Sequence, residues 1–168
     1  MANERNAYFS IKDTKVTYKN FSGAEQRYNP AGKRNFHIYI SEEQANVLRD
    51  AGLNVKDPYV PDSIANDPTK DTESYMPQYK LKINVNANSQ FNHFTLTKFN
   101  SETNEILESE ELNANTLGQL DNLPIVKMNL TFNAWEYDPK DNPGKRTAWA
   151  NNFEAFVDVS KFMNTYEL

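Results

Sequence analysis

The chain has 168 residues, a formal net charge of −5 and an aromatic content of 12%. This length is typical of one domain that buries a sizeable core. The sequence contains no cysteine, which excludes disulfides, cysteine-based zinc sites and thiol catalysis. No apolar run approaches the roughly 20 residues of a membrane-spanning helix. Because Met1 to Asn6 is polar and charged, unlike a signal peptide, we expect an intracellular protein without a membrane partner.

The charge is distributed unevenly along the chain. Arg5 to Ile40 carries seven basic and two acidic residues, a net charge of +5, so the rest carries −10. A local basic surface on an acidic body still attracts phosphates, because salt screens charges over about 8 Å. Ordinary surface variation is the alternative explanation of this asymmetry.

The first half of the chain predicts two strands joined by a long loop. Ala7–Lys19 is rich in β-branched and aromatic residues, which favour a strand. Phe21–Lys33 is a loop that ends in the turn-forming sequence NPAG. Asn35–Ile40 alternates, so we expect a half-buried strand with its apolar residues inward and His37 and Tyr39 outward.

One helix is predicted, beginning at Ser41. Ser41 with Gln44 three residues later is a capping-box pattern, and two glutamates favour the first turn. Gly52 is a natural residue to end the helix. Asp57–Gln78 follows with four prolines and five acids, which predicts a long exposed acidic loop inside one domain, 1–168.

The second half predicts further strands separated by turns. Tyr79–Asn86 alternates with its apolar side chains inward and Lys80 and Lys82 outward. A hairpin and one helical turn follow, and the last two strands enclose a turn with two prolines. Val126 is assigned to the apolar side of the next-to-last strand, and Trp149 to the apolar side of the final strand. The predicted ranges are Phe94–Asn100, Glu105–Leu107, Asn115–Asp121, Ile125–Tyr137 and Arg146–Val159.

These elements predict a mainly β fold. Six or seven strands with one short helix between strands and long loops are typical of an OB-like antiparallel barrel. A β-sandwich is the structural alternative, and a virion structural protein is the function that would accompany it.

The sequence offers no catalytic motif, so we expect a protein that is not an enzyme. His37 and His93 are far apart in sequence and lack metal-ligand spacing, and no nucleophile-elbow or phosphate-loop pattern occurs. The glutamates between Glu102 and Glu111 predict a solvated hairpin rather than a metal site. We therefore expect no cofactor and no metal.

Outward strand positions combine rings with cations, which is the chemistry that single-stranded nucleic acid requires. Lysines follow phosphates, and rings stack on bases with little preference for sequence. If the strands are neighbours, one concave polar sheet results. The alternatives are that the lysines serve solubility, that the rings cap the core and that His37 is a structural hydrogen-bonding residue. The candidates on these strands are His37, Tyr39, Lys80, Lys82, Lys127, Trp135 and Tyr137.

The loop after the first strand is the other candidate contact. Its sequence, FSGAEQRYNPAGKRN, combines cations, rings and glycines that let backbone approach a phosphate closely. A basic connection that binds no ligand is the alternative. The candidates here are Phe21, Arg27, Tyr28, Lys33, Arg34 and Asn35.

Four segments resemble a family of bacteriophage single-stranded DNA-binding proteins: NFSGAEQRYNPAGKRNFHIYIS, LRDAGLNVK, YKLKINVN and NAWEYDPKDNPGKRTAWANNFEAFVDV. The resemblance implies a non-enzymatic protein that coats single-stranded DNA during phage replication or recombination, in the cytoplasm of the infected bacterium. It leaves open whether the protein also binds phage or host replication proteins and whether it forms a homodimer. It also implies that the loop candidates, together with Lys80, Lys82 and Trp135, contact nucleic acid. A phage inhibitor of a host protein, acting partly by acidic DNA mimicry, is the alternative function.

Overall fold

A computed structural model describes residues 6–27, 29–58, 66, 68–69 and 78–160. Tyr28, one of the candidate contacts, therefore lies outside the described residues, as does most of the predicted acidic loop 57–78. The described strands and helices follow the order expected from the sequence, and except in β5 (Glu105–Leu112) their ends agree with the predicted ends within about two residues.

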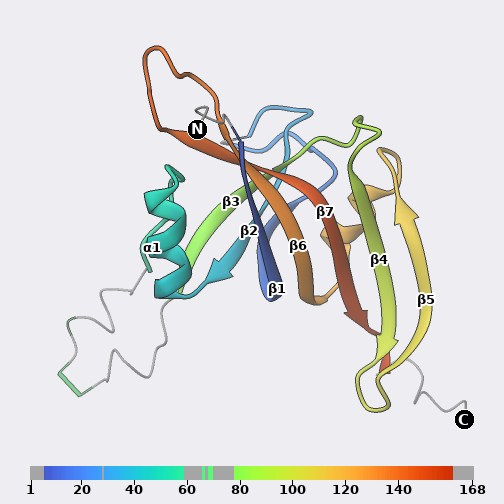
Figure 1. The fold of residues 1–168 in the computed structure, drawn as a ribbon. Helices are drawn as coiled ribbons and strands as arrows, with labels where there is room; N and C mark the ends of the chain where they lie inside the picture. Colours follow the sequence, from blue (N-terminus) through green and yellow to red (C-terminus); the bar gives the residue numbers. More distant parts are fainter. Residues whose placement is uncertain (1–5, 28, 59–65, 67, 70–77, 161–168) are drawn as a thin grey trace, which may run out of the picture.

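Five strands close into a barrel. They are β1 (Asn6–Asn20), β2 (Arg34–Ile40), β3 (Tyr79–Val85), β6 (Ile125–Glu136) and β7 (Arg146–Asp158). Their order is β3-β2-β1-β6-β7, and a parallel pairing of β3 with β7 closes the ring. Figure 1 shows the long, curved β1, β6 and β7 crossing at the centre. This connectivity is an OB-type barrel, which confirms the predicted fold class.

A hairpin widens the sheet beyond the barrel. β4 (His93–Asn100) runs parallel to β7, and β5 (Glu105–Leu112) pairs with β4 at the outer edge. The 3₁₀ helix η1 (Leu117–Asn122) then leads to β6. β5 is longer than the Glu105–Leu107 segment predicted, because its cross-strand partners in β4 hold a glutamate-rich sequence that β propensity disfavours.

The one α-helix among the described residues, α1 (Glu42–Asp50), has the predicted ends. The Ser41 side chain accepts from the Gln44 N–H, and the Gln44 side chain accepts from the Ser41 N–H, so the capping box is complete. After the helix, Leu53 N–H donates to Leu48 and Gly52 N–H donates to Arg49, with Gly52 at φ +92°. This is the Schellman motif that a glycine at this position favours.

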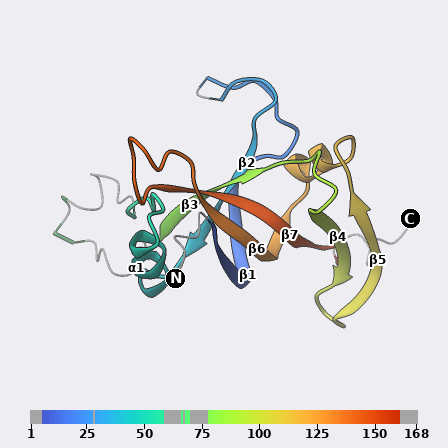
Figure 2. The same ribbon diagram turned by 45° about the horizontal axis from the view of Figure 1, so that its top comes forward.

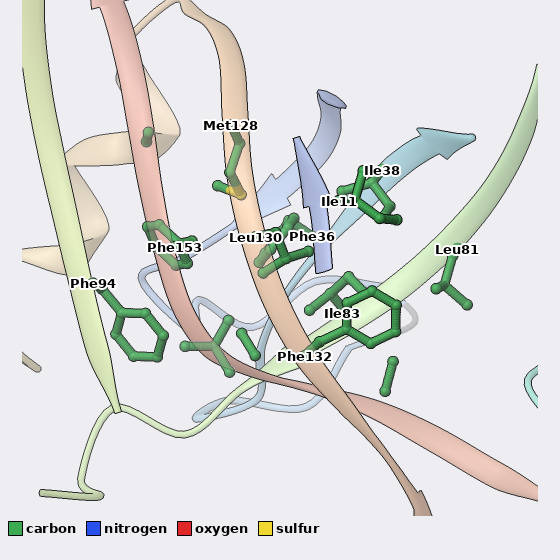
Figure 3. Close-up of a cluster of buried hydrophobic side chains, with 14 of the residues drawn as sticks. Ile11, Phe36, Ile38, Leu81, Ile83, Phe94, Met128, Leu130, Phe132 and Phe153 are labelled. Carbon is green, nitrogen blue, oxygen red and sulfur yellow. The ribbon is translucent and has the colours of Figure 1, made fainter. Parts of the chain in front are cut away.

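The core fills the barrel and continues under β4. Figure 3 shows side chains from β1, β2, β3, β6 and β7 pointing into one cluster, with Phe94 on β4 beside Phe153 on β7. The rings of Phe94 and Phe153 stack at 4.6 Å, and Phe153 meets Phe36 edge-on at 5.9 Å. The β4–β5 hairpin is thereby attached to the barrel through buried aromatic contacts.

Two inward assignments from the sequence are wrong, and β-bulges explain both. The register of β6 and β7 shifts between Ile125 and Lys127, and Val126 is 36% exposed rather than buried. A second shift leaves Asn151 as an extra residue in β7, so Ala148 and Ala150 face inward and Trp149 faces outward. A bulge inverts the alternation on one side of itself, which a strict period of two does not anticipate.

Candidate nucleic-acid interface

The outer surface of β2 and β3 brings four of the predicted residues together. These strands pair antiparallel, with Tyr39 opposite Lys80 and His37 opposite Lys82. Their apolar neighbours, such as Ile38 and Leu81, are buried on the other side. The two outward faces therefore form one patch in which each ring lies opposite a cation, as the alternation of both strands predicts.

Tyr18 on β1 extends this patch and was not among the sequence candidates. Its ring is 63% exposed, lies 5.3 Å from the His37 ring in an edge-on arrangement, and lies 4.7 Å from the Lys80 Nζ. Tyr18 has φ +47° at a register irregularity between β1 and β2, which redirects its side chain. We call Tyr18, His37, Tyr39, Lys80 and Lys82 the cationic face.

The surroundings of His37 on the cationic face lower its pKa. Burial, and to a smaller extent the positive charges of Lys80, Lys82 and Lys56, together lower the pKa of His37 to about 4. Its imidazole is therefore neutral at pH 7. The Nδ1 atom is buried and has no hydrogen-bond partner among the described residues. The cationic face thus combines a neutral ring with several lysines, as nucleotide binding requires.

A groove of about 340 Å³ lies beside the cationic face. Its walls include His37 and Lys82, Lys56 from the segment after α1, and Arg146 and Thr147 at the start of β7. Lys56 and Lys80 are joined by a pair of backbone hydrogen bonds of 2.8 and 3.1 Å. The groove therefore concentrates positive charge next to an aromatic surface, which favours a phosphate chain.

The loop 21–33 borders the start of β2. Figure 2 shows it extending from the top of the barrel. Gly32 N–H donates to Gly23 at 2.8 Å and Lys33 N–H donates to Pro30 at 3.3 Å, so its ends are tied together. Arg27 and Lys33 are exposed. In OB folds the surface of strands 2 and 3 and the loop between strands 1 and 2 bind oligonucleotides, and both are occupied here by predicted residues.

Two of the loop candidates are buried, which corrects their assignment as contacts. Phe21 is fully buried, with its ring stacked on Phe36 at 4.9 Å. Asn35 is 7% exposed, and its Nδ2 donates to the Asn29 Oδ1 at 2.8 Å. Both residues stabilise the base of the loop. The sequence does not distinguish a buried ring beside a loop from an exposed ring.

The charged side chains at the base of the loop form hydrogen bonds with backbone groups. Arg34 donates to the Phe21 carbonyl at 2.7 Å and to the Ala114 carbonyl at 2.8 Å. Asp121 on η1 accepts from the Phe21 N–H at 2.7 Å, and Lys19 donates to the Leu120 carbonyl at 2.9 Å. Burial lowers the pKa of Lys19, partly offset by Asp121. Arg34 therefore positions the loop that carries Arg27 and Lys33.

The candidates from β6 do not join the cationic face. β6 lies between β1 and β7, so the expectation of one concave sheet of three neighbouring strands is wrong. Lys127 contacts Asp13 at 3.6 Å and lies 5.0 Å from the Phe156 ring. Trp135 is half-buried on the outer side of the barrel, and Tyr137 lines a separate groove beside residues 52–55.

Other classes of site are not seen in the described residues. No group of three or more histidine, aspartate or glutamate residues there could hold a metal ion. None of the described helices has the length and apolar character needed to cross a bilayer.

Comparison with known proteins agrees with the geometry. Residues 2–159 match the family described as "Putative phage ssDNA-binding domain". No curated protein matches the chain individually. The matched range includes the whole barrel, the cationic face and the loop 21–33. Since the match covers well over half of the sequence, this chain belongs to the phage single-stranded DNA-binding family.

Proposed function

We propose that this protein is a non-enzymatic, sequence-tolerant coat for single-stranded DNA in phage replication or recombination, acting in the cytoplasm of the infected cell. The cationic face carries this proposal, because Lys80 and Lys82 lie opposite Tyr39 and His37 on neighbouring strands. Lysines there neutralise phosphates while the rings stack on bases. Stacking reads no base identity, so weak sequence preference is expected.

A net charge of −5 is compatible with this function. Acidic residues are concentrated on β5, where Glu105, Glu108 and Glu111 are exposed at the outer edge of the sheet. The cationic face lies on β1, β2 and β3, and β4 and β7 separate β5 from β3, the nearest of these strands. Because salt screens charges beyond about 8 Å, the glutamates of β5 weaken phosphate binding little.

Titration with fluorescently labelled oligo-dT and a duplex of equal length, each at two salt concentrations, tests the proposal. The expected result is tighter binding to the single strand that weakens steeply as salt increases. Lys33→Glu should weaken this binding, since Lys33 is exposed on the loop. Absence of salt-sensitive binding to any single strand would contradict the proposal.

A protein target is the second candidate function, favoured by the exposed glutamates of β5 together with exposed Ile106 and Leu107. Such an edge could present an acidic surface to a host enzyme. Lys33→Glu and Lys82→Glu separate the two functions in a phage growth assay. Both substitutions should impair growth if the protein coats DNA and should leave growth unchanged if β5 is the active surface.

A further inference from the structure

A second groove, of about 230 Å³, lies on the outer side of β6 and β7 below the loop 86–92. Both tryptophans of the chain, Trp135 and Trp149, line it. Its other walls are Asn133, Asn151 and residues of the loop, and none of the lining residues carries a charge. We call it the tryptophan groove. Its chemistry is that of stacking and amide hydrogen bonding, without phosphate neutralisation.

The β-bulge at Asn151 creates this surface. By turning Trp149 outward it places that indole opposite Asn133 on β6, and Asn133 in turn lies opposite Tyr8 on β1. Trp149 is 36% exposed and Tyr8 is 67% exposed. A row of ring, amide and ring therefore crosses three strands, and its large aromatic groups are open to solvent.

A chain of amide hydrogen bonds lines the groove. Asn151 donates from Nδ2 to the Asn133 Oδ1 at 3.1 Å, and Asn133 donates from Nδ2 to the Asn6 Oδ1 at 2.6 Å. The Asn151 Oδ1 is buried and has no hydrogen-bond partner among the described residues. These asparagines make the wall of the groove polar but uncharged, which suits hydrogen bonds to a base rather than to a phosphate.

The tryptophan groove neighbours the cationic face through the pairing of β3 with β7. Asn84 on β3 lies opposite Trp149 where β3 and β7 pair, and its Nδ2 donates to the Ala148 carbonyl at 3.1 Å. Asn84 is two residues from Lys82 along the same strand. A chain bound to the cationic face therefore reaches the tryptophan groove by crossing one strand.

We infer that the tryptophan groove is a nucleobase subsite for the same single strand whose phosphates the cationic face binds. The inference rests on the proposed function and extends the binding path around the barrel to β7 and β6. An unpaired base would stack on Trp149 and donate an N–H to the amide side chains that line the groove. Each of the four bases carries an N–H donor, so the subsite tolerates any sequence.

Intrinsic fluorescence tests this inference directly, because both tryptophans lie in the groove. Binding of oligo-dT of about 20 nucleotides should quench tryptophan emission and protect it from acrylamide, whereas about 4 nucleotides, the shortest OB site, should bind with less quenching. Trp149→Ala should weaken binding of the long oligonucleotide about 5- to 100-fold. Trp149→Phe should retain most of the affinity, and Ile106→Ala on β5 is the matched control.

The outcomes separate the inference from the proposed function. If labelled oligo-dT binds with the expected salt dependence while emission and acrylamide access stay unchanged, the subsite is wrong and the coat function stands. The subsite would also be overturned if Trp149→Ala binds the long and the short oligonucleotide as tightly as the unmodified protein does. If Trp149→Ala does not fold, the tryptophan emission of the unmodified protein still tests the subsite. If no single strand binds, both proposals fail.

Discussion

The Nζ atom of Lys80 lies 4.7 Å from the centre of the Tyr18 ring, although the two residues come from strands that do not pair with each other. β2 lies between them and contributes His37, which meets Tyr18 edge-on. A nucleotide stacked on Tyr18 would therefore have a cation beside it for its phosphate. Tyr18 is also the most exposed ring of the cationic face, at 63%.

Tyr18→Ala should weaken binding to oligo-dT about 5- to 100-fold, the range for losing one stacked base. Tyr18→Phe keeps the ring and should bind almost as well as the unmodified protein. Fluorescence anisotropy with labelled oligo-dT at constant salt measures both affinities. Equal affinities of the Ala variant and the unmodified protein would exclude Tyr18 from the interface.

Lys82→Ala should reduce the dependence of affinity on salt. Each phosphate contact in a single strand contributes about 0.7 to the slope of log affinity against log salt, so the slope should fall by about that amount. Lys98→Ala is the matched control, because Lys98 lies on β4 and pairs with Glu108 at 3.7 Å. A slope that falls equally in both variants would indicate a general charge effect rather than a contact at Lys82.

Local patterns in the sequence were sufficient to predict most of the fold and part of the site. The capping box at Ser41 and the alternation of β2 and β3 are set by neighbouring residues, so they are readable without tertiary information. The same alternation placed His37, Tyr39, Lys80 and Lys82 on outward faces, and pairing of β2 with β3 then brought them together.

The remaining parts of the site depend on tertiary structure. Tyr18 and Trp149 face outward because of backbone irregularities, which a regular period of two does not predict. The sequence predicts a phosphate contact at Arg34, but in the structure its guanidinium donates to the carbonyl of Ala114, which is 80 residues away. Contacts over such a sequence separation follow from the closed barrel and have no local signal.

Arg34→Ala should destabilise the protein by about 1–3 kcal/mol, because it leaves two backbone carbonyls without their charged donor. Lys33→Ala, at the neighbouring exposed position, should leave the free energy of unfolding within about 0.5 kcal/mol of the unmodified value. Urea unfolding followed by circular dichroism measures both. Similar losses in the two variants would contradict a positioning role specific to Arg34.

Gly52→Ala should be more damaging than Gly32→Ala. Both glycines have positive φ, +92° and +87°, so alanine at either position costs about 1–2 kcal/mol of backbone strain. Only at Gly52 would the added Cβ overlap the carbonyl oxygen of Gly144, while at Gly32 nothing lies within 4 Å. We expect a further loss of at least about 1 kcal/mol for Gly52→Ala in the same unfolding measurement. Equal losses would mean that the turn before β7 shifts at little cost to accommodate the added methyl group.

Stability should fall in mild acid because of His37. Its pKa is about 4 in the folded protein, lowered chiefly by burial, and about 6.5 when unfolded. Between these values the unfolded state binds more protons, so the free energy of unfolding decreases as the pH falls from about 6.5 to about 4. Above pH 6.5 the residue is neutral in both states and contributes no pH dependence.

His37→Gln removes this titration. Urea unfolding at intervals from pH 8 to pH 4.5 should give parallel curves for the two proteins above pH 6.5. Below pH 6.5 the unmodified protein should lose stability faster, since only it carries the group that the unfolded state protonates preferentially. Curves that remain parallel throughout would mean that burial and the neighbouring lysines do not lower the pKa of His37 in the folded protein.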